Sequence, residues 1–269
     1  KYFLFENDKW IQKKAAPLFF DNDPFSIFSK DIDLENIKTF KIQLEKSSTP
    51  RQGVNTCGAN NVFIFKEVIA EDDFSMLLVN KHQQKVRVPK KYVYPLIDNK
   101  NFNEDNPKPK KYILLLYNKE TGRPIPPEEL NKYKELNEYF KYNEQKLKER
   151  SGTFLKSWTK DGRYWACLGV GKYNFYKYKV AWQSFGTKIF YASIFSSYER
   201  QEWQGNQAMH AYIPCKSYEE ALVVKEKLNS LSVRVYLESF NMTGTKSWAQ
   251  PGKLKRLIEF TDQGQLSLF

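Results

Sequence analysis

Short runs of β-branched and aromatic residues recur along this chain, each ended by glycine, asparagine or proline, and they restrict it to a fold rich in short strands. The clearest runs are "IKTFKIQL" (37–44), "VFIF" (62–65), "SMLLVN" (75–80), "QKVRV" (84–88), "KYILLLY" (111–117), "RYWACLG" (163–169), "YKVAWQ" (178–183), "KIFYAS" (188–193) and "AMHAYIP" (208–214). Only a few residues separate the runs at 75–80 and 84–88, which predicts a hairpin. We therefore expect mixed, mostly antiparallel sheets.

Two segments have helical spacing instead. Residues 127–150 begin with a proline and two acids, which suit a first helical turn, so we expect one long surface helix at about 127–150. Its apolar face would consist of Leu130, Tyr133, Leu136, Phe140 and Leu147. Ser217 and Glu220 have the spacing of a capping box and predict a shorter late helix at about 217–229. Together with the strands, these helices predict the α+β class.

The charge of the chain indicates its kind of partner. There are 43 Lys and Arg against 31 Asp and Glu, a formal charge of +12. Such an excess most often means a polyanionic partner or an anionic surface. No stretch approaches the roughly 20 apolar residues of a membrane span, and the start lacks the apolar core of a signal peptide, so we expect a cytoplasmic protein. Because the chain begins with Lys1, we also expect it to be part of a longer protein.

Candidates for catalysis or metal binding are sparse. His82 and His210 have no second ligand at metal spacing, and the consecutive acids at 71–73 are more typical of a solvated turn than of a magnesium site. The three cysteines lie far apart, so we expect reduced, mostly buried thiols at Cys57, Cys167 and Cys215. We expect neither a catalytic residue nor a metal site in this chain.

Two stretches concentrate positive charge. Residues 81–111 hold nine Lys or Arg against three acids, and residues 172–188 hold four lysines and no acid, interleaved with aromatic rings. Lysines that displace counterions from phosphates, beside rings and polar side chains that contact bases, would bind nucleic acid. The structural alternative is a solvated sheet face with lysines reaching to water. We favour nucleic acid for the second stretch and weigh the two interpretations equally for the first.

The loop "RQGVNTCGANN" (51–61) is rich in groups that can contact bases. Arg can pair with guanine, and Asn or Gln with adenine. The residues concerned are Arg51, Gln52, Asn55, Thr56, Asn60 and Asn61. Composition alone favours the alternative, in which these side chains hold the turns of the loop itself.

Several of these segments, in order, resemble the target recognition region of TaqI-like adenine-N6 DNA methyltransferases of bacterial restriction-modification systems. The resemblance covers about residues 45–240. It is carried by "RQGVNTCGANNVFIF", "YVYPLI", "KYILLLY", "LKERSG", "YWACLGVGKYNFYKYKVAW" and "EKLNS". It implies that the chain binds double-stranded DNA and reads its sequence.

In that family the chemistry belongs to a separate catalytic domain. That domain binds S-adenosylmethionine and carries an (Asn/Asp/Ser)-Pro-Pro-aromatic motif that holds a flipped adenine. The nearest segment here, Asn22-Asp23-Pro24-Phe25, has an acid where the first proline belongs, and no glycine-rich cofactor loop is present. The resemblance therefore implies a recognition module without a cofactor of its own, which serves a catalytic domain in cis.

The resemblance also implies domain bounds and contact residues. Residues 1–44 would be a linker, 45–250 the target recognition domain and 251–269 a tail. In the loop at 51–61, Arg51, Gly53, Val54, Thr56, Gly58 and Asn60 fit the family pattern, with Gln52 and Cys57 inserted. In the second segment Lys172, Lys177 and Lys179 would approach phosphates beside Tyr173, while Tyr178, Val180 and Trp182 would form one packed strand face.

The last five residues, "QLSLF" (265–269), look like the pentapeptide by which bacterial proteins bind the replication sliding clamp. Gln265, Leu266, Leu268 and Phe269 would make this contact, and the alternative is a terminal strand that docks on its own domain. Three other functions stay open for the whole chain. It could be a specificity subunit of a multi-chain restriction system, a nuclease fused to recognition elements, or an interaction module that does not bind DNA.

Overall fold

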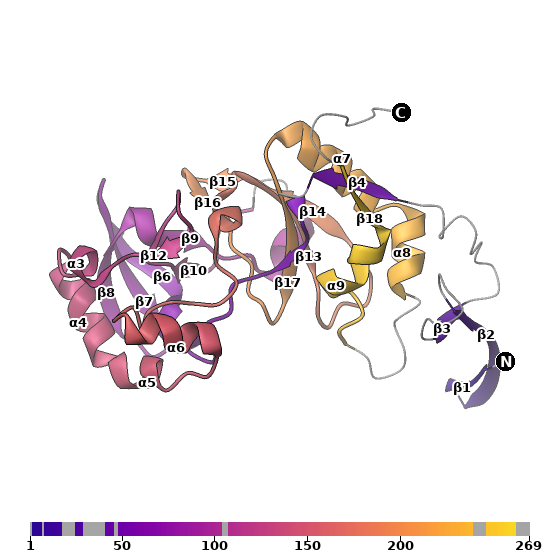
Figure 1. The fold of residues 1–269 in the computed structure, drawn as a ribbon, viewed down its shortest axis with the longest axis horizontal. Helices are drawn as coiled ribbons and strands as arrows, with labels where there is room; N and C mark the ends of the chain where they lie inside the picture. Colours follow the sequence, from indigo (N-terminus) through magenta and orange to yellow (C-terminus); the bar gives the residue numbers. More distant parts are fainter. Residues whose placement is uncertain are drawn as a thin grey trace.

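The computed structural model describes residues 2–6, 8–17, 25–28, 41–45, 48–103, 107–238 and 246–261. The chain forms two lobes side by side along the long axis of the molecule, and a small antiparallel sheet lies at one end (Figure 1). That sheet has the order β1-β2-β3 and consists of β1 (Tyr2–Glu6), β2 (Lys9–Pro17) and β3 (Phe25–Phe28). The fold is α+β with mostly antiparallel sheets, as the sequence predicts.

The first lobe is built on a five-stranded antiparallel sheet with the order β8-β7-β6-β10-β9. Its strands are β6 (Ile64–Glu71), β7 (Ser75–Asn80), β8 (Lys85–Pro89), β9 (Val93–Pro95) and β10 (Tyr112–Leu114). The hairpin expected from the runs at 75–80 and 84–88 is confirmed as β7 and β8. Apolar residues of this sheet form one core with the helices that follow it.

The expected long helix at 127–150 is divided into three: α3 (Pro127–Leu130), α4 (Lys134–Tyr142) and α5 (Glu144–Lys148). The breaks fall where Tyr133 has φ −116° and ψ 89°, and at Asn143, which ends α4 and precedes α5. Asparagine and aromatic residues are poor helix formers, and packing decides the outcome here. The predicted apolar face is confirmed, because Leu130, Leu136, Phe140 and Leu147 are buried and Tyr133 packs against them.

The second lobe is built on the antiparallel order β14-β13-β17-β5. Its strands are β5 (Arg51–Gln52), β13 (Tyr178–Gln183), β14 (Ala192–Phe195) and β17 (His210–Cys215). The late helix is confirmed as α7 (Tyr218–Leu228), with the Ser217 hydroxyl accepting from the Glu220 N–H at 3.1 Å. The segment 231–238, which suits helix or strand equally by sequence, is α8 (Leu231–Glu238).

The core of the second lobe extends beyond the expected domain bounds. β4 (Ile42–Glu45) pairs in parallel with β18 (Ile258–Thr261), and α9 (Pro251–Leu254) leads into that strand. Ile42, Leu44, Leu254 and Leu257 are all buried in this core. Residues from the expected linker and from the expected tail thus both contribute to this core.

Several short elements complete the described chain. Two small sheets pair β11 (Tyr117–Asn118) with β12 (Arg123–Pro124), and β15 (Ser197–Tyr198) with β16 (Gln201–Glu202). α2 (Asn60–Phe63) takes the first half of the run predicted as a strand at 62–65, and β6 begins with the second half. The run at 163–169, also predicted as a strand, follows α6 (Thr153–Lys160) and forms no strand. The 3-10 helices are η2 (Lys90–Tyr92), η3 (Asn99–Asn103), η4 (Lys172–Phe175) and η5 (Lys255–Leu257).

Two expectations from composition can be compared with this fold. All three cysteines are free, and Cys167 and Cys215 are buried, as predicted. Within the described ranges, no helix has the length and apolar character needed to cross a membrane.

Candidate nucleic-acid interface

The loop at 51–61 lies in the seam between the two lobes and is held there by backbone hydrogen bonds. The Val54 N–H donates to the Gly205 carbonyl at 2.7 Å, and the Val54 carbonyl accepts from the Gln207 N–H at 3.0 Å. On the other side, Asn55 and Leu168 exchange two N–H···O bonds of 2.9 Å. The loop is therefore a fixed part of the lobe junction.

One buried arginine fixes the loop to the helical part of the first lobe. The Arg150 guanidinium donates to four backbone carbonyls: Leu147 (3.0 Å), Thr56 (3.1 Å), Tyr164 (2.6 Å) and Ala166 (2.8 Å). Arg150 is 7% exposed, and its guanidinium lies 5.4 Å from the centre of the Phe63 ring. Arginine suits this position because its rigid fork offers five donors.

The structure brings the two sequence-predicted DNA-binding segments together. The guanidinium of Arg51 lies over the ring of Tyr173, 3.8 Å from its centre. The Gln52 amide donates to the Gln250 side chain and accepts from Gln207 at 3.2 Å. β5 and η4 are thus direct neighbours, although they lie far apart in the sequence.

Two of the predicted contact residues instead support the turn of the loop. The Asn55 side-chain oxygen accepts from the Cys57 N–H at 2.8 Å, and the buried Thr56 hydroxyl donates to the Asn60 side-chain oxygen at 2.6 Å. This is the structural alternative that the composition of the loop favours. Asn60 remains exposed at the start of α2.

The three predicted phosphate-binding lysines do not share one environment. Lys172 and Lys177 are exposed, but Lys179 is 1% exposed and its ammonium donates to the Tyr176 carbonyl at 3.0 Å. The expectation that Lys179 approaches a phosphate is corrected, because β13 lies between β14 and β17 and both of its faces are covered. Burial lowers the pKa of Lys179 to about 7.

The opposite face of β13 follows the prediction. Val180 and Trp182 lie in the core of the second lobe, and Tyr178 packs against it. The Trp182 indole N–H donates to the Ala249 carbonyl at 2.8 Å, which joins the central strand to the segment before α9. Aromatic residues of this stretch therefore serve mainly the fold.

A cleft of about 600 Å³ opens beside the loop, between the first lobe and the turn before β17, and we call it the amide cleft. It is lined by Asn60, Asn61, Ile64, Lys66, Lys81, Leu96, Ile97, Asp98, Asn99, Lys111, Asn206, Met209 and His210. Four asparagines and three lysines thus border one concave surface, together with a single acid. Lys66, Lys81 and Lys111 are exposed.

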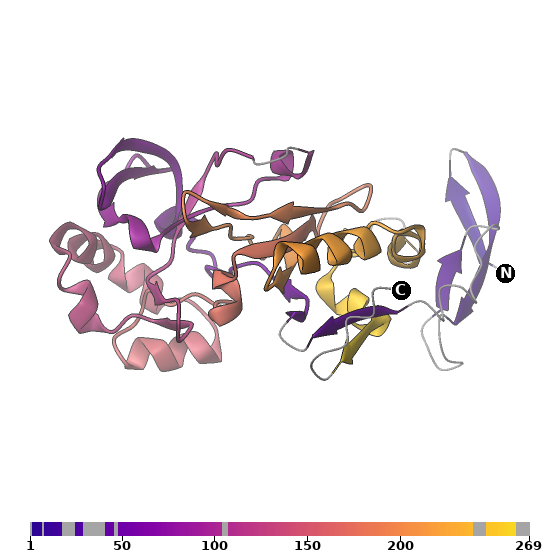
Figure 2. The same ribbon diagram turned by 90° about the horizontal axis from the view of Figure 1, so that it is seen from above.

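The amide cleft and the lysines near η4 lie on different sides of the seam. Neither Lys172 nor Lys177 lines the cleft. Figure 2 shows η3, the short helix beside a grey segment, on the upper side of the molecule and η4, the salmon turn, toward the lower side. Lys172 and Lys177 are therefore not part of the cleft surface.

His210 closes the inner end of the amide cleft. It is 3% exposed, its Nδ1 accepts from the Asn206 N–H at 3.3 Å, and its Nε2 lies 2.9 Å from the Asn99 side-chain oxygen. Its ring also lies 5.7 Å from the Phe102 ring. Burial lowers the pKa of His210 to about 4, so the imidazole is neutral near pH 7.

Most residues of the amide cleft were not selected from the sequence. Lys81 and Lys111 belong to the basic stretch 81–111, for which two interpretations stayed equal. Lys66, Asn99 and Asn206 are isolated polar residues with no local motif. Only their meeting in three dimensions distinguishes them, and the signal in the sequence is limited to the loop that carries Asn60 and Asn61.

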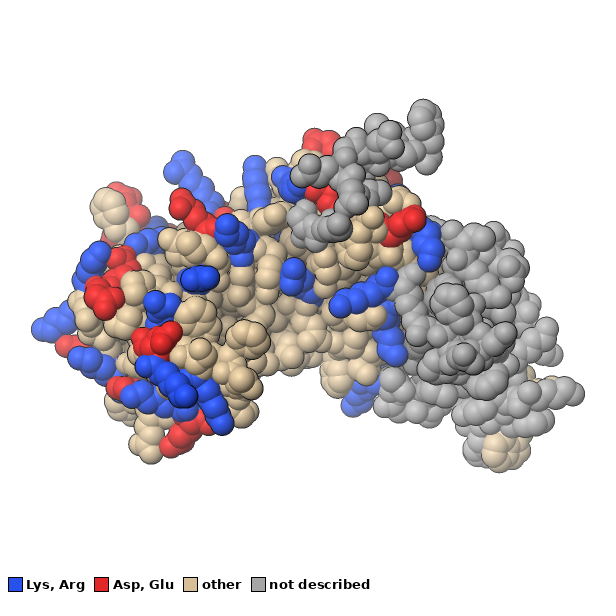
Figure 3. Space-filling model, viewed as in Figure 1, with Lys and Arg blue, Asp and Glu red and all other residues tan. Residues whose placement is uncertain are grey.

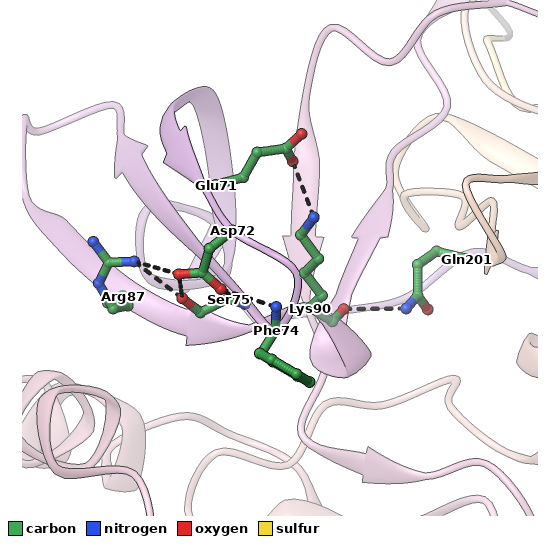
Figure 4. Close-up of polar contacts among 7 residues, drawn as sticks. All are labelled: Glu71, Asp72, Phe74, Ser75, Arg87, Lys90 and Gln201. Atoms are coloured by element: carbon green, nitrogen blue, oxygen red, sulfur yellow. Dashed lines mark hydrogen bonds and ion pairs between the residues drawn. The ribbon is translucent and has the colours of Figure 1, made fainter.

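A second groove, of about 680 Å³, lies between the β6–β7 turn and α4. Two cations of its lining pair with acids beside the groove: Arg87 binds Asp72 at 3.2 Å, and Lys90 lies 3.6 Å from Glu71 (Figure 4). Asp72 also accepts from the Phe74 and Ser75 N–H groups. Glu71 is the last residue of β6, and Asp72 and Asp73 lie in the exposed turn that follows it, where the sequence predicts a solvated turn. Because acids balance the cations around it, this groove does not fit a polyanion.

The distribution of charge over the molecule does not by itself indicate which surface would bind a polyanion. On the face drawn in Figure 3, lysines and arginines are spread over both lobes, and acids gather on the left-hand lobe and along the upper edge. Within the part of the chain that the structure describes, no group of three His, Cys, Asp or Glu side chains is placed to hold a metal ion. The terminal segment with Gln265, Leu266, Leu268 and Phe269 lies outside the described residues.

Comparison with known proteins adds no family assignment. No protein-family model matches the chain, and no curated protein matches it either.

Proposed function

We propose that this chain binds double-stranded DNA in a sequence-specific manner, through the amide cleft and the loop at its edge. The observation that carries the proposal is the meeting of four asparagines and three lysines in one cleft at the seam of the lobes. Lysines provide affinity for phosphates, and amides discriminate between base edges. The charge of +12 supports the same partner.

The resemblance in sequence suggests which kind of DNA-binding protein this is. The chain would be the target recognition module of an adenine-N6 DNA methyltransferase of a bacterial restriction-modification system and would act in the cytoplasm. A catalytic domain in cis would bind S-adenosylmethionine and perform the methyl transfer. Contact with a sliding clamp through the last five residues is part of the same proposal. The rigid attachment of the recognition loop to both lobes supports this role, since a reading surface must be held in register.

The decisive experiment measures the binding of fluorescent duplex DNA by anisotropy at salt concentrations from about 50 to about 300 mM. Over this range the affinity of a protein that neutralises phosphates falls measurably with salt. Lys66 and Lys81 line the cleft, and no described residue pairs with either ammonium. The double variant Lys66→Gln/Lys81→Gln should lower affinity for all duplexes and reduce the salt slope by about 1.8, since each phosphate contact contributes about 0.9.

The matched control is Lys156→Gln/Lys160→Gln in α6, which lies on the opposite side of the molecule from η3 (Figure 2). It removes the same charge, so it should leave the slope close to that of the parent. Electrostatic binding to DNA is strongest at low salt. If the chain bound no duplex even at about 50 mM salt, the result would contradict DNA binding and favour a protein-interaction module.

A further inference from the structure

The side-chain oxygens of the asparagines in the amide cleft already accept hydrogen bonds from within the protein. The Asn206 oxygen accepts from the Ala208 N–H at 3.0 Å, and the Asn61 oxygen accepts from the Lys146 ammonium at 2.8 Å. The Asn60 oxygen accepts from the Thr56 hydroxyl at 2.6 Å. Each of these oxygens keeps one lone pair, whereas both N–H bonds of each amide have no acceptor among the described residues, so these amides offer a ligand more donors than acceptors.

The fourth amide is oriented by His210. Because the His210 Nδ1 accepts from a backbone N–H, its proton sits on Nε2. Nε2 then donates to the Asn99 oxygen at 2.9 Å. The Asn99 NH₂ is therefore also left over, and among the described residues none of the four NH₂ groups has an acceptor.

The lysines of the cleft also offer hydrogen-bond donors. Lys66, Lys81 and Lys111 contribute ammonium groups, which only donate. The one carboxylate, Asp98, accepts from the Lys111 ammonium at 3.3 Å and from the Lys100 N–H at 3.2 Å. The cleft thus offers a ligand more hydrogen-bond donors than acceptors, because each of its acceptors already binds a donor of its own chain.

The apolar part of the lining favours a base over a phosphate, although both ligands are rich in hydrogen-bond acceptors. Phosphate oxygens and the edge of a base both accept hydrogen bonds, but Ile64, Leu96, Ile97 and Met209 provide an apolar wall. A phosphate is strongly hydrated and gains nothing from such a wall, whereas a base edge in a groove of the duplex also carries apolar C–H groups, which do. The lysines at the rim remain available for the flanking phosphates.

We propose that the amide cleft recognises a guanine base through its N7 and O6 acceptors. Guanine presents two acceptors on that edge, whereas adenine and cytosine present an amino group that would face donors, and thymine presents one acceptor beside a methyl group. This specificity replaces the adenine pairing expected for Asn60, because the Thr56 hydroxyl already fills one lone pair of the amide oxygen that a bidentate pair with adenine would use. The proposal rests on the proposed function, since it assumes that the ligand is DNA.

The test begins with selection of bound duplexes from a random-sequence library by the complete chain. The selected consensus should contain guanine. In that consensus, 7-deazaguanine should replace each guanine in turn, which removes only the N7 acceptor. At one position we expect affinity to fall about tenfold or more.

Protein variants test the same contact from the other side. Asn206→Asp keeps the oxygen that Ala208 needs and replaces the NH₂ donor with an acceptor, so the preference for guanine should be lost. The matched control is Asn118→Asp, whose oxygen accepts from the Thr121 N–H at 2.9 Å outside the cleft, and its preference should match that of the parent.

The outcomes separate the two proposals. Salt-dependent duplex binding with full tolerance of 7-deazaguanine at every position, or a consensus without guanine, would overturn the guanine assignment and leave DNA binding standing. Absence of duplex binding at any salt concentration would overturn both. The 7-deazaguanine measurement uses the unmodified protein, so it does not depend on the folding of any variant.

Discussion

The Arg51 guanidinium lies 3.8 Å from the centre of the Tyr173 ring, which couples the start of the recognition loop to η4. The Nε of Arg51 is buried and has no hydrogen-bond partner among the described residues. The ring, rather than a hydrogen bond, therefore sets the plane of the guanidinium. A guanidinium stacked in this way loses little entropy when its remaining donors bind a phosphate or a base.

Tyr173→Ala should weaken duplex binding about 2- to 5-fold, because a cation–π contact at such a site contributes about 0.5–1 kcal/mol. Tyr173→Phe keeps the ring and should bind like the parent. Anisotropy titrations at one fixed salt concentration measure the difference. Equal affinity of the Ala and Phe variants would mean that the stack does not prepare Arg51 for binding.

Arg150→Lys should lower the free energy of unfolding by about 2–4 kcal/mol, since one ammonium cannot serve four separate carbonyls and buried acceptors are left unpaired. Urea denaturation followed by tryptophan fluorescence measures this loss. Arg123→Lys is the control, because Arg123 is exposed in β12. An unfolding free energy equal to that of the control would contradict the supporting role of Arg150.

Gly53→Ala should force the recognition loop away from the segment that precedes β17. A Cβ atom at Gly53 would lie 2.3 Å from the backbone carbon and oxygen of Gly205, and backbone cannot move aside as a flexible side chain can. We expect a loss of about 1–3 kcal/mol in stability. Gly252→Ala, where a Cβ meets nothing within 4 Å, should stay within about 1 kcal/mol of the parent. Thermal unfolding of the two variants side by side tests the close approach.

Local patterns predicted those elements that depend on local interactions. Ser217 caps α7 as the spacing of Ser217 and Glu220 indicates, and the buried side of residues 127–150 follows the apolar repeat. The division of that segment into three helices was not predictable, because backbone angles at Tyr133 and Asn143 are decided by packing against the sheet. The same holds for residues 163–169, where Trp165 and Cys167 are buried without belonging to a strand.

The candidate site was only half visible in the sequence. The loop at 51–61 carries a recognisable set of polar residues, but Asn99 and Asn206 reach the amide cleft from other parts of the chain. The direction of hydrogen bonding, which leaves the amides with more free donors than acceptors, depends on partners such as His210 and Ala208. Such contacts are set by the tertiary structure and leave no periodic signal.

Lys179 tests the correction to the predicted phosphate contacts, and its effect depends on pH. Burial lowers its pKa from 10.5 to about 7 in the folded chain, so the unfolded chain binds the proton more tightly. Stability should therefore be lost as pH falls from about 10.5 to about 7 and should level off below that, where both states are protonated.

Lys179→Met removes the titrating ammonium group, so the stability advantage of this variant over the parent should grow as pH falls across this interval and reach about 1–4 kcal/mol at neutral pH. Lys179→Arg keeps a charge that cannot be neutralised and should be less stable than the parent throughout. Urea denaturation of the three proteins at several pH values measures these differences. If the Met variant instead weakened DNA binding and followed the pH dependence of the parent, Lys179 would be exposed to the ligand rather than enclosed beneath Tyr212.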